Sequence, residues 1–143
     1  MKCWTVFALV LGGAFLLSIG SRQLSAQNCS DDEGMVTYYN KNVTDLVETV
    51  KKESVTDFAK AFHQKTMMTN LTLFGGTVDR LLTCLQKRAS DPSTLKADAD
   101  AAKGKIDSFN KLKDKIKQDR DALKAAQAEK DAKALIEKIS FTG

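Results

Sequence analysis

Residues 67–85 read MMTNLTLFGGTVDRLLTCL, and their apolar side chains recur in alternating steps of four and three. This spacing is typical of one face of an α-helix that packs against another helix. Gly75 and Gly76 interrupt the apolar seam and predict a kink or a short break, because each glycine costs about 1 kcal/mol in a helix. Flexible methionines also suit an adaptable apolar pocket, but so small a chain needs the seam for its core. The seam consists of Met67, Leu71, Phe74, Val78, Leu81 and Leu85.

Two helix starts are predicted upstream of this seam. Ser30 and Glu33 have the spacing of a capping box, which predicts a helix from just after Cys29 to about Lys52. Ser54 and Asp57 form a weaker version of the same motif. The apolar face of this second helix consists of Val55, Phe58, Ala59 and Phe62.

Downstream, Asp91-Pro92 predicts another helix start, since aspartate caps helices and proline fits the first turn. Helical spacing then continues to about Ile139. One unbroken helix over that range would be about 70 Å long, whereas a globule of this size is roughly 30 Å across. We therefore predict a break between residues 117 and 130, near 118–121. The alternative is a long helix that protrudes as a coiled coil.

These segments predict an all-α fold, a small up-and-down bundle of four or five helices. Strand patterns are nearly absent from the sequence. The predicted core consists of Met35, Tyr39, Val43, Leu46, Val50, Phe58, Phe62, Leu71, Phe74, Val78, Leu81, Leu85, Ile106, Phe109, Leu112, Ile116, Leu123 and Ile139.

The N-terminal residues have the three parts of a secretory signal peptide. Met1 and Lys2 precede an apolar run of about 15 residues, and a polar stretch with small residues ends at Ala26. A helix that spans a bilayer needs about 20 residues, so cleavage is favoured over an uncleaved membrane anchor. We predict a cleaved signal at 1–26, with Gly20 as the alternative cleavage site, and a single secreted domain at 27–143. No second apolar run of this length follows, so no membrane span is expected after cleavage.

Cleavage after Ala26 removes Lys2 and Arg22 and no acid, which lowers the formal net charge from +4 to +2. Such a balance gives no reason to expect a nucleic-acid partner. The lysines of residues 93–143 are interleaved with aspartates around the helix, so they indicate a solvated surface rather than a heparin or membrane stripe.

Cys29 and Cys84 are the cysteines left after cleavage, an even number in an oxidising compartment. They predict one intramolecular disulfide that closes a loop of about 55 residues and stabilises the fold by about 4 kcal/mol. A bridge between two chains is the alternative.

Three triplets match the N-glycosylation motif, at Asn42, Asn70 and Asn28. Asn28 is the poorest candidate because the bridged Cys29 is its middle residue. Occupancy also requires a eukaryotic source.

Catalytic patterns are weak. His63 is the single histidine, and a triad or a metal site needs partners that the sequence does not place beside it. Gly104-Lys105 lacks the flanking residues of a phosphate-binding loop. The sequence therefore predicts no enzyme, no cofactor and no metal.

By elimination, the leading hypothesis is a secreted, non-enzymatic factor that binds an extracellular protein, such as a host-directed salivary, venom or effector protein. The rival hypothesis is an extracellular carrier of a lipid or another small apolar ligand. A carrier needs an apolar cavity, whereas a protein binder needs an exposed patch over a filled core. The modest apolar set favours the filled core, since empty volume costs about 24 cal/mol per Å³.

Overall fold

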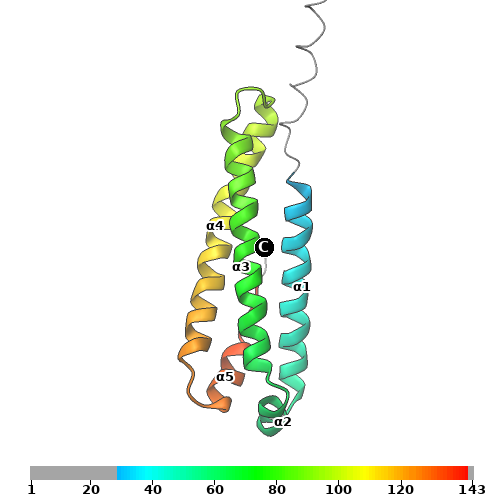
Figure 1. Ribbon diagram of the computed structural model, residues 1–143, viewed down its shortest axis with the longest axis vertical. Helices are drawn as coiled ribbons and strands as arrows, with labels where there is room; N and C mark the ends of the chain where they lie inside the picture. Colours follow the sequence, from blue (N-terminus) through cyan, green and yellow to red (C-terminus); the bar gives the residue numbers. More distant parts are fainter. Residues whose placement is uncertain (1–28, 142–143) are drawn as a thin grey trace, which may run out of the picture.

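The computed structural model describes residues 29–141, which contain five helices and no strand (Figure 1). The predicted all-α bundle is thus confirmed. The predicted signal peptide at 1–26 lies outside the described residues. The helices are α1 (Ser30–Lys52), α2 (Val55–Lys60), α3 (His63–Ser90), α4 (Lys96–Ala125) and α5 (Glu129–Ile136).

Three long helices form the body of the bundle, and α3 lies between α1 and α4 (Figure 1). The short helices α2 and α5 pack on each other at one end of the bundle. Helix α3 therefore has two faces covered by neighbours, and it has more buried side chains than any other helix in the described residues.

The predicted seam on α3 is the centre of the core. All six of its members are at most 2% exposed, which confirms the core interpretation over a pocket. Burying an apolar side chain of this size contributes roughly 1.5–3 kcal/mol, so this one face supplies a large part of the hydrophobic stabilisation.

Helix α3 runs unbroken through Gly75 and Gly76, so the predicted break there is wrong. Packing on both sides outweighs the low helix propensity of two glycines. Gly75 faces α4, where a Cβ at this position would lie 3.6 Å from Ile116 Cγ2. Gly76 has open space around it.

The predicted helix starts have different outcomes. Ser54 caps α2, since its hydroxyl accepts the Asp57 amide N–H at 3.1 Å. Helix α1 begins just after Cys29 and ends at Lys52, as predicted, but Cys29 rather than Ser30 is the N-cap, and the Cys29 side chain makes no capping hydrogen bond. The disulfide at Cys29 anchors the first turn, and Glu33 instead accepts a hydrogen bond from Lys105 Nζ at 2.7 Å.

Asp91-Pro92 marks a boundary between helices, but α4 begins only at Lys96. The Asp91 carboxylate accepts the amide N–H of Ser93 at 2.8 Å and its hydroxyl at 2.6 Å. These bonds fold the chain into a turn, so aspartate here closes a loop rather than capping the next helix.

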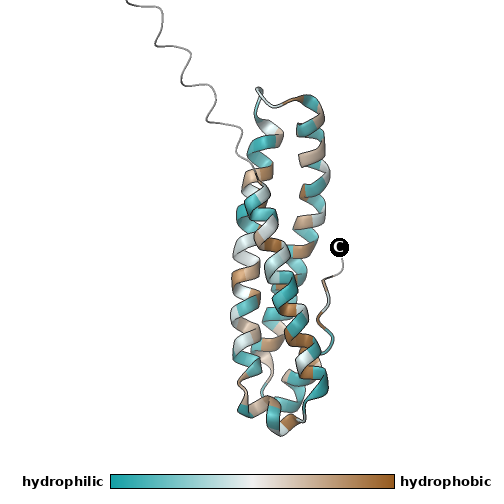
Figure 2. Ribbon diagram, turned by 90° about the vertical axis from the view of Figure 1, so that its right-hand side faces the viewer, coloured by the Kyte–Doolittle hydropathy of each residue, from teal (hydrophilic) through white to brown (hydrophobic). Residues whose placement is uncertain are grey.

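The predicted break after residue 117 is confirmed, since residues 126–128 separate α4 from α5. The protruding coiled coil is wrong for this chain, and 118–121 remain helical. Beyond α5, the chain turns back along the bundle (Figure 2), and Ile139 and Phe141 are buried. The Phe141 ring makes an edge contact with Phe74 of α3 at 5.4 Å, and Lys115 Nζ of α4 lies 5.3 Å from its centroid. The Asn40 side chain of α1 donates to the Phe141 carbonyl, so this segment fills the space between α1, α3 and α4.

Most of the predicted core is buried or partly buried, with two exceptions. Met35 is 38% exposed, because Val36 points inward in its place. Phe62 is 71% exposed, because α2 ends at Lys60 and the chain turns at this residue.

Cys29 and Cys84 form a disulfide within the chain, as predicted. It joins the start of α1 to the last turns of α3. Within residues 29–141, no helix is long and apolar enough to cross a bilayer.

Candidate functional site

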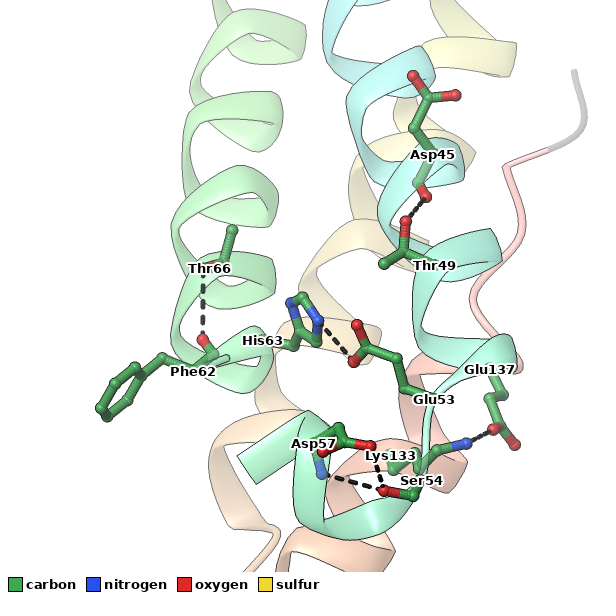
Figure 3. Close-up of polar contacts among 10 residues, drawn as sticks. All are labelled: Asp45, Thr49, Glu53, Ser54, Asp57, Phe62, His63, Thr66, Lys133 and Glu137. Carbon is green, nitrogen blue, oxygen red and sulfur yellow. Dashed lines mark hydrogen bonds and ion pairs between the residues drawn. The ribbon is translucent and has the colours of Figure 1, made fainter. Parts of the chain in front are cut away.

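The corner that joins α1, α2 and α3 has the most unusual local geometry in the described chain (Figure 3). Three consecutive helices meet here within about ten residues, from Glu53 at the end of α1 to His63 at the start of α3. Ser54 caps the short helix α2 by accepting the Asp57 amide N–H, and its hydroxyl also donates to the Asp57 carboxylate at 2.7 Å.

Glu53 and His63 face each other across this corner (Figure 3). His63 Nε2 lies 2.8 Å from Glu53 Oε2, and the two side chains are 14% and 27% exposed. Both atoms are buried, and neither has a hydrogen-bond partner elsewhere in the described residues. Within the described residues, each of these two atoms therefore has only the other as a polar partner, and the contact joins the end of α1 to the start of α3.

Phe62 immediately precedes His63 and has the left-handed backbone conformation, with φ at 54°. It is the only non-glycine residue with positive φ in the described chain, and this conformation costs roughly 1–2 kcal/mol for an L-residue. The Phe62 carbonyl accepts the amide N–H of Thr66 at 3.1 Å and its hydroxyl at 3.3 Å. The surroundings thus hold the strained backbone in place.

The turn sends adjacent aromatic side chains in opposite directions. The Phe62 ring points away from the bundle (Figure 3), whereas the His63 ring lies 5.9 Å from the ring of buried Phe58. Gln64 then donates to the Leu123 carbonyl at 3.0 Å, which ties the start of α3 to the end of α4. The exposed phenyl ring is consequently attached to a segment that contacts of His63 and Gln64 hold in place.

Sequence reasoning found the Ser54 cap but missed the other features of this corner. His63 was predicted to be passive, and its partner Glu53 was not recognised because the two lie on different helices. Phe62 was placed in the core because it continues the apolar spacing of α2. The local sequence has no Gly or Asn that would indicate a left-handed residue. The left-handed conformation of Phe62 is therefore evident only from the positions of α2 and α3 in the structure.

The other predicted site residues lie elsewhere. Asn42 is on α1 and Asn70 on α3, and each is half-buried. Asn28 lies outside the described residues. Cys29 and Cys84 are joined at the opposite end of α3 from His63.

A surface pocket of about 320 Å³ lies beside the disulfide, between α1 and α3. Arg80 Nε lies 3.6 Å from Asp32 Oδ1, and Asp79 Oδ1 lies 2.6 Å from Lys113 Nζ of α4. Its charges are therefore of both signs, and three of its four charged side chains form ion pairs, which favours neither an anion nor an apolar ligand. The lining consists of Asp32, Asp79, Arg80, Thr83, Cys84 and Lys87.

Surface hydrogen bonds shift a few ionisable groups. The bond to Asp79 raises the pKa of Lys113, and their Coulomb attraction adds to the effect. The Lys51 ammonium lowers the pKa of Glu48, and the two hydrogen bonds from Ser93 lower the pKa of Asp91. These shifts come from solvent-accessible pairs, so they mark local surface structure rather than a desolvated acid or base.

Four of the eight lysines of α4 are paired with acids. Lys103 pairs with Asp100 and Lys115 with Asp119 on the same helix. Lys105 and Lys113 pair with acids of α1 and α3. In the part of the chain that is described, no three His, Cys, Asp or Glu side chains are grouped so as to hold a metal ion.

Comparison of the chain with family models, with curated proteins and with solved structures finds no match.

Proposed function

We propose that the chain is a secreted, non-enzymatic factor that binds an extracellular protein through the end of the bundle that carries Phe62. Secretion is supported by the signal-like N-terminus, and the disulfide fits an oxidising compartment. The localisation proposed is therefore extracellular, with residues 1–26 removed.

The observation that carries the proposal is the exposure of Phe62 in a strained conformation. A residue is retained in the left-handed region at a cost in stability, and such strain clusters at functional positions. Aromatic side chains are also enriched in the centres of protein interfaces. Val55, 42% exposed on α2 at the same end, adds apolar surface there.

The carrier hypothesis has less support. Four of the six residues that line the pocket beside the disulfide are charged, which does not favour a lipid ligand there. Large core side chains such as Phe58, Phe74 and Met67 are at most 1% exposed, which is consistent with a filled interior. Binding of a fluorescent fatty acid at sub-micromolar affinity would favour the carrier instead.

The test compares Phe62→Gly, Phe62→Ala and Leu95→Ala as baits in extracellular fluid from the source tissue. Leu95 is the matched control, because it is 75% exposed but lies at the opposite end of the bundle. A partner captured by the unaltered protein and by Leu95→Ala should be lost from both Phe62 variants. The expected weakening is about 30-fold, the effect of removing an interface residue worth about 2 kcal/mol.

Phe62→Gly also separates binding from folding. Glycine adopts positive φ without strain, so this variant should be about 1 kcal/mol more stable than Phe62→Ala in urea unfolding. A more stable protein that no longer binds supports the proposal. Equal capture of the partner by Phe62→Gly, or no specific partner at all, overturns it.

A further inference from the structure

Asn42 and Asn70 share an unusual environment for half-buried amides. Neither side chain makes a hydrogen bond to any residue within 29–141. Asn40 Oδ1 is fully buried without a partner, but no atom of Asn42 or Asn70 is, so both amides reach solvent. Each amide is therefore accessible and uncommitted to the fold.

The two asparagines lie at nearly the same height on antiparallel helices. The Cys29–Cys84 disulfide and the Glu53–His63 contact fix the alignment of α1 with α3 at both ends. Interpolation between these contacts places Asn42 and Asn70 about three residues apart along the axis, or roughly 4–5 Å at 1.5 Å per residue.

The Glu53–His63 contact also indicates that both asparagines face one side of the α1–α3 interface. Asn42 is eleven residues before Glu53, which is close to three full turns of an α-helix. Asn70 is seven residues after His63, which is close to two full turns. Because Glu53 and His63 are in contact, the two asparagines line the same side of the α1–α3 interface.

Exposed apolar side chains flank the two asparagines. Tyr38 is 55% exposed and lies four residues before Asn42, and Leu73 is 47% exposed and lies three residues after Asn70. Residues at these spacings are neighbours on a helix surface. Met35, 38% exposed and seven residues before Asn42, extends the same strip. We call Met35, Tyr38 and Leu73 the apolar edge.

We propose that N-linked glycans on Asn42 and Asn70 lie side by side at the α1–α3 interface and cover the apolar edge. Both residues begin N-x-T triplets. The apolar C–H face of a sugar ring removes apolar side-chain surface from water when it lies against it. The inference rests on the proposed secretion but is independent of Phe62 and its partner.

The modification is a group transfer from a lipid-linked oligosaccharide diphosphate. An N-glycosidic bond forms between the anomeric carbon and Nδ2, the anomeric bond to the diphosphate breaks, and the lipid diphosphate leaves as the amide loses a proton. In the folded helices, the Thr44 hydroxyl donates to the Asn40 carbonyl at 2.9 Å and the Thr72 hydroxyl to the Met68 carbonyl at 2.8 Å. Transfer therefore precedes folding, while these hydroxyls and the extended chain are accessible.

The experiment uses the full chain expressed with its own N-terminus in eukaryotic cells and collected from the medium. Peptide N-glycosidase converts a glycosylated asparagine into aspartate, and tandem mass spectrometry locates the change. Both Asn42 and Asn70 should be converted, and Thr44→Ala and Thr72→Ala should each abolish one conversion while keeping the asparagine.

Hydroxyl-radical footprinting then tests the cover. Labelling of Met35, Tyr38 and Leu73 should be lower in the glycosylated protein than after enzymatic deglycosylation. Phe62 and Leu95, exposed at the two ends of the bundle, are the controls and should not change. Unmodified asparagines in the secreted protein, or an apolar edge labelled equally in both forms, overturn the inference. Neither result depends on whether the Phe62 variants lose a partner.

Discussion

Phe62 and His63 are adjacent in the sequence but have opposite environments. The left-handed backbone at Phe62 points its ring into solvent, while His63 turns inward to Glu53 and the ring of Phe58. The buried carboxylate and imidazole depend on each other, because burying a polar group without a partner costs free energy. A single contact thus sets the direction in which Phe62 is presented.

Glu53→Ala should lower the free energy of unfolding by about 1–3 kcal/mol, because it leaves His63 Nε2 buried without a partner. The double variant Glu53→Ala/His63→Ala should cost less than the sum of the two single changes, as in any pair of interacting side chains. Urea unfolding measures all three. The control is Lys41→Ala, which removes an exposed ion pair with Asp45 and should change stability by less than about 1 kcal/mol. Additive single effects would mean that the two side chains do not interact.

Helix α3 is the element on which the rest of the bundle is assembled. Its seam packs on α1 and α4, and its hydroxyl groups are used within the helix. Thr77, for example, is 1% exposed and donates to the Leu73 carbonyl at 3.0 Å. Gly75 lies where α4 approaches, whereas Gly76 has open space around it. The two glycines therefore differ in what surrounds them although both interrupt the same helix.

Gly75→Leu and Gly76→Leu should have opposite effects on stability. A Cβ at Gly75 already reaches contact distance of Ile116, so further carbons must push α4 away, with an expected loss of about 1–3 kcal/mol. A side chain at Gly76 meets no neighbour, and replacing glycine there should stabilise the helix by up to about 1 kcal/mol. Thermal or urea unfolding of the pair distinguishes them. Equal effects would contradict the orientation of α3 against α4.

Helices α1 and α3 are linked to each other at both ends of the bundle. The disulfide lies at one end, and the Glu53–His63 contact lies at the other. On the remaining side, the segment that ends at Phe141 fills the space between α1, α3 and α4. Helices distant in the sequence are thereby held together without a sheet in the described chain.

Cys29→Ser/Cys84→Ser should lower the free energy of unfolding by about 4 kcal/mol, the chain-entropy value for a loop of 55 residues. Reduction of the unaltered protein should have the same effect, which serves as the control for the substitutions themselves. Guanidinium unfolding with and without reductant provides the measurement. A change below about 1 kcal/mol would show that the unfolded chain is already compact or that the bridge strains the fold.

The sequence by itself determined the helical class, the disulfide partners and most of the core. Helical spacing depends on which residues are apolar, and Leu71, Phe74 and Val78 follow that spacing closely. Because Cys3 lies in the predicted signal peptide, two cysteines remain and allow one intramolecular pairing, so no geometry was needed to name it. The Ser54 cap was also readable, because its partner Asp57 is only three residues away.

Only the tertiary structure decided the features that depend on neighbours remote in the sequence. Burial between two helices keeps α3 continuous through Gly75 and Gly76, against their propensity. The meeting of α1 and α3 pairs Glu53 with His63, and the sharp turn before α3 turns Phe62 outward although it continues an apolar pattern. The shared position of Asn42 and Asn70 at the α1–α3 interface likewise depends on the alignment of two antiparallel helices. Periodicity reports one helix at a time, whereas these features arise from the free energy of packing helices together.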